Sequence, residues 1–190
     1  MMTVLLFHHA HGQTPGFLAF ADQLRAAGHT VHTPDLYDGL TFADLDEGVA
    51  NAGRVGFGEI IRRGTQAAKE LPPDIVYAGF SLGVLPAQSL GQTRAGARGA
   101  LLYSGCVQPS EFGGPWPHGV PVQIHMVDED PWGEEDRPAA EALVREGEDA
   151  ELFVYPGSGH LFTEPELKDY DEQAAKLLME RSLAFLDRRL

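Results

Sequence analysis

The stretch DIVYAGFSLGV, residues 74–84, decides the fold. Its first half is a short apolar run of the kind that forms a buried parallel strand, and the residues after it have the composition of a helix. Ser81 is therefore expected on a tight strand-to-helix turn, where Gly79 and Gly83 avoid the collisions that Cβ atoms would cause. Such a turn exposes the serine hydroxyl at the end of a strand, and the Leu82 amide faces the same space. The pattern indicates a nucleophile, although it also occurs in plain glycine-rich turns.

Strand-like and helix-like segments alternate along the rest of the chain. We expect strands at 3–7, 30–33, 74–78, 100–103, 120–127 and 152–155, and helices at 17–27, 59–71, 82–90, 136–146 and 169–190. The loop between them at 37–58 is long enough to hold a short helix or to line a site. This order predicts one α/β domain over residues 1–190, with a mostly parallel sheet and helices on both faces. Ligands bind such sheets at the carboxyl ends of the strands.

Composition excludes several classes of function. The 190 residues carry a formal charge of −14, and the 14 Lys and Arg are scattered. Without a basic stripe, neither nucleic acid nor an anionic membrane surface is an expected partner. No apolar run approaches the roughly 20 residues of a membrane span, and the N-terminus lacks the basic flank of a signal peptide. Cys106 is the single cysteine, which excludes an internal disulfide. We expect a cytoplasmic monomer or homodimer.

A serine nucleophile needs a base and a group that fixes the tautomer of that base. In the order Ser–Asp–His, both partners follow Ser81 and lie just after strands. His160 stands in a glycine-rich loop after the last expected strand, and Asp128 and Asp130 follow the strand at 120–127. Asp128 comes directly after that strand, whereas Asp130 precedes a proline that keeps its backbone out of a helix. Sequence geometry alone leaves the two aspartates equal.

The chain resembles the dienelactone hydrolase family over nearly its whole length. The matching segments are the first strand with its loop, PDLY at 34–37, the turn at Ser81, HMVDED at 125–130 and YPGSGHLF at 155–162. The last segment, which is followed by Tyr170 and the terminal helix, is the most specific. The resemblance implies a compact α/β-hydrolase fold without a cap domain.

The resemblance also implies an activity and a set of site residues. It favours Asp130 over Asp128 as the acid of a triad with Ser81 and His160, and it places the oxyanion hole at the amides of Ala10 and Leu82. The implied reaction is hydrolysis of a small ester, thioester or lactone through an acyl-enzyme, with no cofactor.

Three positions depart from the family's pattern. Ser81 replaces the cysteine nucleophile of relatives of the type enzyme, His9 replaces a glutamate in the oxyanion loop, and Glu164 replaces an arginine that holds a substrate carboxylate. Arg54, Arg62 and Arg63 remain candidates for that carboxylate-binding role. Because acidic residues cluster near the same rim, we expect the local field to repel anions and the substrate to be an uncharged small-molecule ester.

Histidines and aromatic residues surround the expected nucleophile. Alternate residues of an extended segment share a face, so we expect His9 and His11 to line the site and His8 to pack inside. No carboxylate or cysteine stands at ligand spacing beside them, and we expect no metal. Phe80 and Trp132 are candidates for the wall of an acyl pocket.

Two other functions are compatible with parts of this pattern. A non-catalytic α/β-hydrolase-like protein that binds a small molecule would keep the pocket, but the presence of all three triad residue types argues against it. A nucleotide-binding domain needs a glycine-rich loop after the first strand. The segment HHAHG at 8–12 has one glycine, and we reject that reading.

Overall fold

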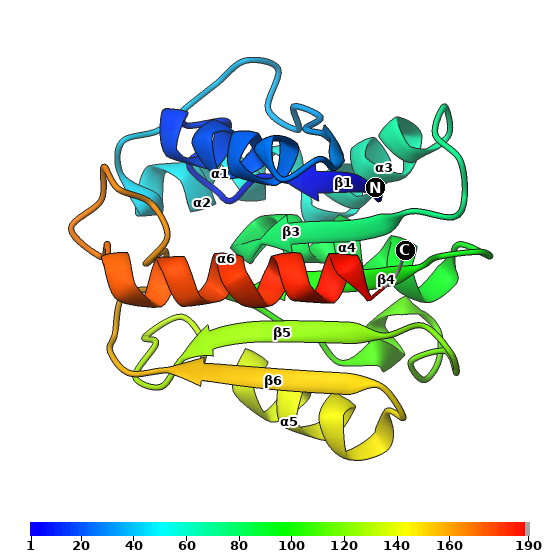
Figure 1. The fold of residues 1–190 in the computed structure, drawn as a ribbon. Coiled ribbons are helices and arrows are strands. Elements are labelled where there is room, and N and C mark those ends of the chain that lie inside the picture. The colour runs from blue at the N-terminus through cyan, green and yellow to red at the C-terminus, as the bar shows by residue number, and fades with distance from the viewer. Residues whose placement is uncertain (189–190) are drawn as a thin grey trace.

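A computed structural model describes residues 1–188 of the chain. Over this range six parallel strands form one sheet in the order β2-β1-β3-β4-β5-β6 (Figure 1). The strands are β1 (Thr3–Phe7), β2 (Thr30–His32), β3 (Val76–Phe80), β4 (Gly99–Tyr103), β5 (Val122–Val127) and β6 (Ala150–Tyr155). The predicted parallel sheet is confirmed.

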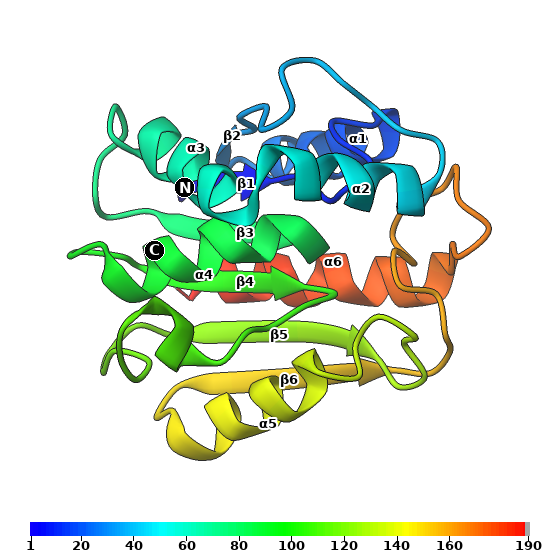
Figure 2. The same cartoon turned by 180° about the vertical axis from the view of Figure 1, so that it is seen from behind.

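Helices cover both faces of the sheet, as expected. They are α1 (Pro15–Ala26), α2 (Leu45–Val55), α3 (Phe57–Ala68), α4 (Val84–Thr93), α5 (Asp136–Glu146) and α6 (Glu172–Asp187). Figure 1 shows α1 and α6 on the near face, and the reverse view in Figure 2 shows α2 to α5 on the other. Side chains along each strand alternate between two cores, and this accounts for strands that are apolar along their whole length.

The helix boundaries follow local signals in the sequence. The side chains of Thr14, Asp44 and Asp171 accept hydrogen bonds from amides in the first turns of α1, α2 and α6. We expected the long loop at 37–58 to hold a short helix or to line a site, and the structure shows that it contains the helix α2. The last expected helix was to reach Leu190; α6 ends at Asp187, and residues 189–190 lie outside the described residues.

The strand order places a crevice at the centre of the sheet. From β1 the chain moves outward to β2, and it then crosses back to place β3 on the other side of β1. The connections after β1 and β3 therefore leave in opposite directions, and their loops separate at the carboxyl ends of these two strands. The His8–Gly12 loop and the Ser81 turn both start at this point. Across residues 1–188, no helix is long and apolar enough to cross a membrane.

Candidate active site

Ser81 lies on a strained turn between β3 and α4. One turn of 3₁₀ helix covers Ser81–Gly83, and the φ angle of Ser81 is 48°, a left-handed value that side chains other than glycine rarely adopt. A Cβ atom on Gly79 would collide with the Gly83 carbonyl, and one on Gly83 would collide with the carbonyl of Phe7 in β1. Both glycines are therefore required by close backbone contacts, as the sequence pattern predicts.

The structure brings Ser81, His160 and Asp130 together in a hydrogen-bonded row. Ser81 Oγ lies 2.8 Å from His160 Nε2, and His160 Nδ1 lies 2.7 Å from Asp130 Oδ2. The side chains of His160 and Asp130 are 5% and 3% exposed. Because a carboxylate only accepts hydrogen bonds, the proton between the last two residues belongs to Nδ1, and Nε2 is free to accept the serine proton. The Trp132 amide donates to Asp130 Oδ1 at 2.9 Å and fixes the carboxylate further.

The two aspartates that the sequence left equal have different surroundings. Asp128 is exposed and accepts a hydrogen bond from the Gly157 amide at 2.8 Å. This contact joins the loop after β5 to the loop that presents His160. Asp130 is the carboxylate in contact with the imidazole, in agreement with the choice that the family resemblance favours.

A small cavity adjoins Ser81 on the side of the α2–α5 layer. Its volume is about 220 Å³, and Ala10, Ser81 and Leu82 line it together. The amide of Ala10 donates no backbone hydrogen bond to another residue of the 1–188 range, and Leu82 lies in the first turn of a helix, where amides have no partner within the helix. The remaining wall is largely apolar and includes Val49, Ala52, Phe57, Val84, Leu85 and Val107. The arrangement offers two free amides and an apolar chamber next to one hydroxyl.

Cys106 lines the same cavity but is chemically inert. Burial, together with the nearby Asp136 carboxylate, raises the pKa of the thiol to about 12. The reactive form of cysteine is the thiolate, which is nearly absent at neutral pH under these conditions. Cys106 therefore forms part of the cavity wall.

A second, wider cleft borders His160. Its volume is about 870 Å³, and His11, Trp132 and His160 are among the residues that line it. Its charged residues within the described range are Asp44, Asp46, Glu129, Glu166 and Asp169, with Lys168 as the single cation. Trp132 borders both the cleft and the smaller cavity. The cleft is therefore a region of negative potential.

His9 and Glu164, the two exchanged positions of the family pattern, are in contact with each other. Both side chains are buried, with His9 Nε2 3.1 Å from Glu164 Oε1. Thr14 Oγ1 donates to the other Glu164 oxygen at 2.8 Å. Burial lowers the pKa of His9 more than the carboxylate raises it, so the ring is neutral at neutral pH. The pair joins the loop after β1 to the segment that follows His160.

The structure corrects two expectations about the walls of the site. Phe80 is 1% exposed and stacks on Tyr103 in the core under α1 and α6, because its place on β3 turns the side chain away from the cavity. His9 also lines neither the cavity nor the cleft. His11 and Trp132 do line the cleft, as expected.

The other histidine of the first loop has a packing role. His8 Nε2 accepts the Leu36 amide hydrogen at 3.0 Å, and Nδ1 lies 2.7 Å from the His9 carbonyl oxygen. Both ring nitrogens are thus occupied by the protein backbone. Among residues 1–188, no group of three or more His, Cys, Asp and Glu side chains is placed to hold a metal ion.

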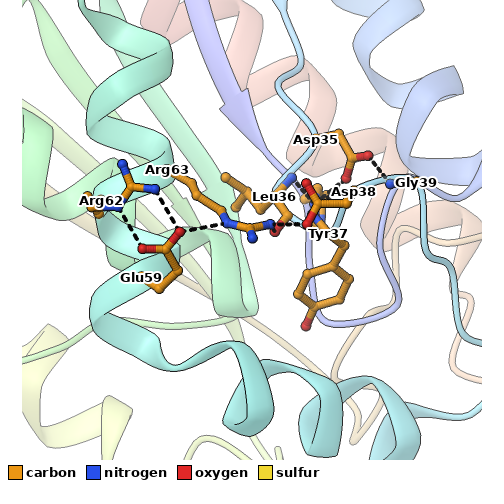
Figure 3. A network of polar contacts seen from close by, with 9 residues as sticks. Asp35, Leu36, Tyr37, Asp38, Gly39, Glu59, Arg62 and Arg63 are labelled. Carbon is orange, nitrogen blue, oxygen red and sulfur yellow. Dashed lines mark hydrogen bonds and ion pairs between the residues drawn. The ribbon is translucent and has the colours of Figure 1, made fainter.

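The three arginines that were candidates for binding a substrate carboxylate are bonded to other groups. Arg62 and Arg63 both bind Glu59, which lowers the pKa of Glu59 to about 2 (Figure 3). Arg63 also donates to the Leu36 carbonyl and to Asp38, each at 2.8 Å, so it anchors the loop after β2 to α3. The third, Arg54, donates to a neighbouring asparagine on α2, and no arginine within the described residues lines the cavity or the cleft.

Sequence reasoning missed Asp136 as a residue of the cavity. Its side chain lines the cavity from the first position of α5, close to Cys106. Nothing in the spacing between Asp136 and Ser81 signals this contact, since it depends on how α5 packs against β6 at the edge of the sheet. In sequence it is one of several acidic residues on a polar rim.

Comparisons with known proteins agree with this arrangement. The family model described as the dienelactone hydrolase family matches residues 1–190. A dienelactone hydrolase from Anabaena variabilis is 18% identical, with 99% of this chain and 86% of that chain covered and a TM-score of 0.68. A dienelactone hydrolase-like promiscuous phosphotriesterase from metagenomic libraries is 18% identical over the same shares, with a TM-score of 0.77.

A third solved structure is described only as an esterase. A cold-adapted esterase from an Arctic intertidal metagenomic library is 17% identical, with 100% of this chain and 83% of that chain covered and a TM-score of 0.68. No curated protein sequence gives a significant match. The structures share the α/β-hydrolase fold, and the family model covers the whole sequence. The chain belongs to the dienelactone hydrolase family.

Proposed function

We propose that the protein is a serine hydrolase that cleaves a small uncharged ester, thioester or lactone through an acyl-enzyme. Membership of the dienelactone hydrolase family makes it an ester-acting hydrolase. The observation behind the finer proposal is the hydrogen-bonded row from Ser81 through His160 to Asp130 beside a cavity with two free amides. Each member of the row has the partner that nucleophilic catalysis requires.

In the acylation step, Ser81 Oγ attacks the substrate carbonyl while His160 Nε2 accepts the hydroxyl proton. Asp130 holds the imidazole in the required tautomer and stabilises the imidazolium that forms. The amides of Ala10 and Leu82 donate to the oxygen that becomes negative. Loss of one such donor typically costs about 3–4 kcal/mol of transition-state stabilisation. His160 then protonates the leaving group, and water attacks the acyl-enzyme with His160 again as base.

The charge of the cleft supports an uncharged substrate. Among the described residues that line it, carboxylates outnumber the single cation, Lys168, and the arginines of α3 bind Glu59 and the loop after β2. A substrate carboxylate would meet repulsion and no guanidinium partner. Dienelactone, an anionic substrate, fits this site poorly.

A fluorophosphonate probe tests the proposed nucleophile. We expect one probe to attach to Ser81, located by mass spectrometry of a proteolytic digest. The variant Ser81→Ala should stay unlabelled, and Ser110→Ala, which removes an exposed serine that lines neither the cavity nor the cleft, should label fully. Attachment to Cys106 would contradict the proposal. Absence of any label on folded protein would favour the non-catalytic binding protein.

The position of the Ala10 loop is tested by two glycines of α2. A Cβ atom on Gly48 would collide with the carbonyl of Ala10, whereas one on Gly53 would meet no atom within 4 Å. We expect Gly48→Ala to lower kcat/KM on an aryl ester at least tenfold by displacing the Ala10 amide, since misplacement by about 1 Å is known to cost about 100-fold. Gly53→Ala should keep full activity and gain about 0.5–1 kcal/mol of unfolding free energy in urea titration. Equal activity of the two variants would disprove the role of this loop.

A further inference from the structure

Asp136 is the one formally charged residue among those described around the small cavity. The neighbouring side chains there are apolar apart from Ser81 and the protonated thiol of Cys106. Its carboxylate is close to the backbone of Ser81. A Cβ atom on Gly105 would lie 3.2 Å from Asp136 Oδ2 and 3.6 Å from the Ser81 carbonyl oxygen. A single small residue therefore separates the carboxylate from the backbone of Ser81.

The hydrogen-bonding capacity of this carboxylate is largely unused. Oδ2 accepts one hydrogen bond, of 3.3 Å, from the Cys106 amide, and no other hydrogen bond or ion pair to a residue of the 1–188 range forms. A carboxylate offers about four acceptor positions. Burial raises the pKa of Asp136, because the cavity supplies too few donors to replace the lost water. A donor on a bound molecule would restore the missing interaction.

The cavity is the place for the acyl part of a substrate, an assignment that depends on the proposed function. His160 must protonate the leaving group, and His160 borders the wide cleft but not the small cavity. The leaving group therefore lies in the cleft. The acyl chain then extends past Ser81 into the cavity of about 220 Å³. At about 30 Å³ for a group the size of water, this volume holds a short acyl chain.

We propose that Asp136 determines acyl specificity, selecting acyl groups that carry a hydroxyl or ammonium donor near the carbonyl and rejecting those that carry a carboxylate. A donor on the acyl chain reaches the free carboxylate oxygen and replaces the water that it lost. An apolar chain of the same shape leaves that oxygen without a partner. A carboxylate on the chain meets a like charge at short range in apolar surroundings.

Three isosteric esters test this proposal on the full-length protein. They are the p-nitrophenyl esters of 3-methylbutanoic, 3-hydroxybutanoic and 3-aminobutanoic acid, which place methyl, hydroxyl and ammonium at one position. We expect kcat/KM for the hydroxyl and ammonium esters to exceed that for the methyl ester by about 10- to 100-fold, the range of a hydrogen bond to a charged group. The succinate monoester should be the slowest substrate. Since these ratios come from the unaltered protein, the result does not depend on a variant that folds.

Variants assign the selectivity to one carboxylate. In Asp136→Asn we expect the ammonium-to-methyl ratio to fall at least tenfold and the succinate ester to gain relative to the methyl ester. Glu134→Gln removes the same charge from an exposed residue that lines neither the cavity nor the cleft, and it should leave all ratios unchanged. A methyl ester hydrolysed as fast as the donor esters, or a ratio unchanged in Asp136→Asn, would overturn the proposal. Ser81-dependent hydrolysis of the methyl ester would in that case still support the serine hydrolase.

Discussion

Replacement of Ser81 by alanine is expected to lower kcat for a short aryl ester by about 10⁴- to 10⁶-fold, the range found when a triad nucleophile is removed. The loss is large because the serine oxygen forms the covalent intermediate, and no neighbouring group can substitute for it. The Cys106 thiol is protonated, since burial raises its pKa to about 12. The measurement is initial-rate kinetics on p-nitrophenyl acetate, with unfolding curves to confirm that the variant is folded.

Asp130 and Asp128 provide a matched pair of variants that tests the hydrogen-bonded row of Ser81, His160 and Asp130. Asp130→Asn should lower kcat by about 10⁴-fold, because an amide in place of the carboxylate favours the wrong imidazole tautomer. Asp128→Asn should leave kcat close to its original value, since Asp128 contacts the Gly157 amide and not His160. The double variant of Ser81→Ala with Asp130→Asn should be no slower than Ser81→Ala alone. Residues that act as a unit do not have additive effects on the rate, because removal of one already abolishes the function of the others. Full activity in Ser81→Ala would refute the mechanism.

Acid is expected to destabilise the fold strongly between pH 6.5 and 4, because several buried histidines are neutral in the native state, His8 and His125 among them. His8 accepts the Leu36 amide hydrogen, and burial lowers its pKa to about 4. In β5, His125 is bonded by its two ring nitrogens to Tyr155 and Gln123, and burial with the nearby Arg181 charge lowers its pKa to about 3. In the unfolded chain both titrate near the ordinary value of 6.5.

The direction of the effect follows from proton binding. Below pH 6.5 the unfolded chain binds protons at these rings and the native state does not, so the free energy of unfolding falls as the pH falls. At about 1.4 kcal/mol per pH unit and per group, each histidine removes about 3 kcal/mol by pH 4. The combined loss of unfolding free energy from the two histidines is comparable with the whole stability of a typical domain, about 5–15 kcal/mol.

Urea titrations at pH 7.5, 6.5, 5.5 and 4.5 measure how steeply the free energy of unfolding falls as the pH falls. His125→Gln should be less stable at pH 7.5 and should lose part of the slope, since one of the buried titrating rings is gone. His118→Gln removes an exposed histidine, with a side chain that is 85% exposed, and should keep the full slope. A free energy of unfolding that stays constant from pH 6.5 to 4.5 would contradict the burial of neutral rings.

Local patterns predict the fold and the centre of the site because each has a short-range cause. The strand, the glycine-flanked serine and the helix at 74–93 lie within a few residues of one another, and the close contact between Gly79 and the Gly83 carbonyl depends on that local geometry. The position of His160 after the last strand follows from the parallel topology. These features needed no knowledge of long-range packing.

The walls of the site could not be predicted in the same way. Phe80 is next to Ser81 in sequence, yet strand alternation directs its side chain into the opposite core. His9 is turned toward Glu164, a partner far away along the chain. Asp136 enters the cavity through the packing of α5. In each case the direction of a side chain depends on a layer that sequence spacing does not encode.

The contact between Gly83 and the carbonyl of Phe7 couples the appearance of reactivity to the completion of folding. During synthesis β1 leaves the ribosome long before β3, and the two strands become neighbours only when the centre of the sheet closes. The Ser81 turn acquires its geometry in that same event, so we expect a partly folded chain to have no reactive hydroxyl. The fraction of protein that a covalent serine probe labels should then count the correctly folded molecules.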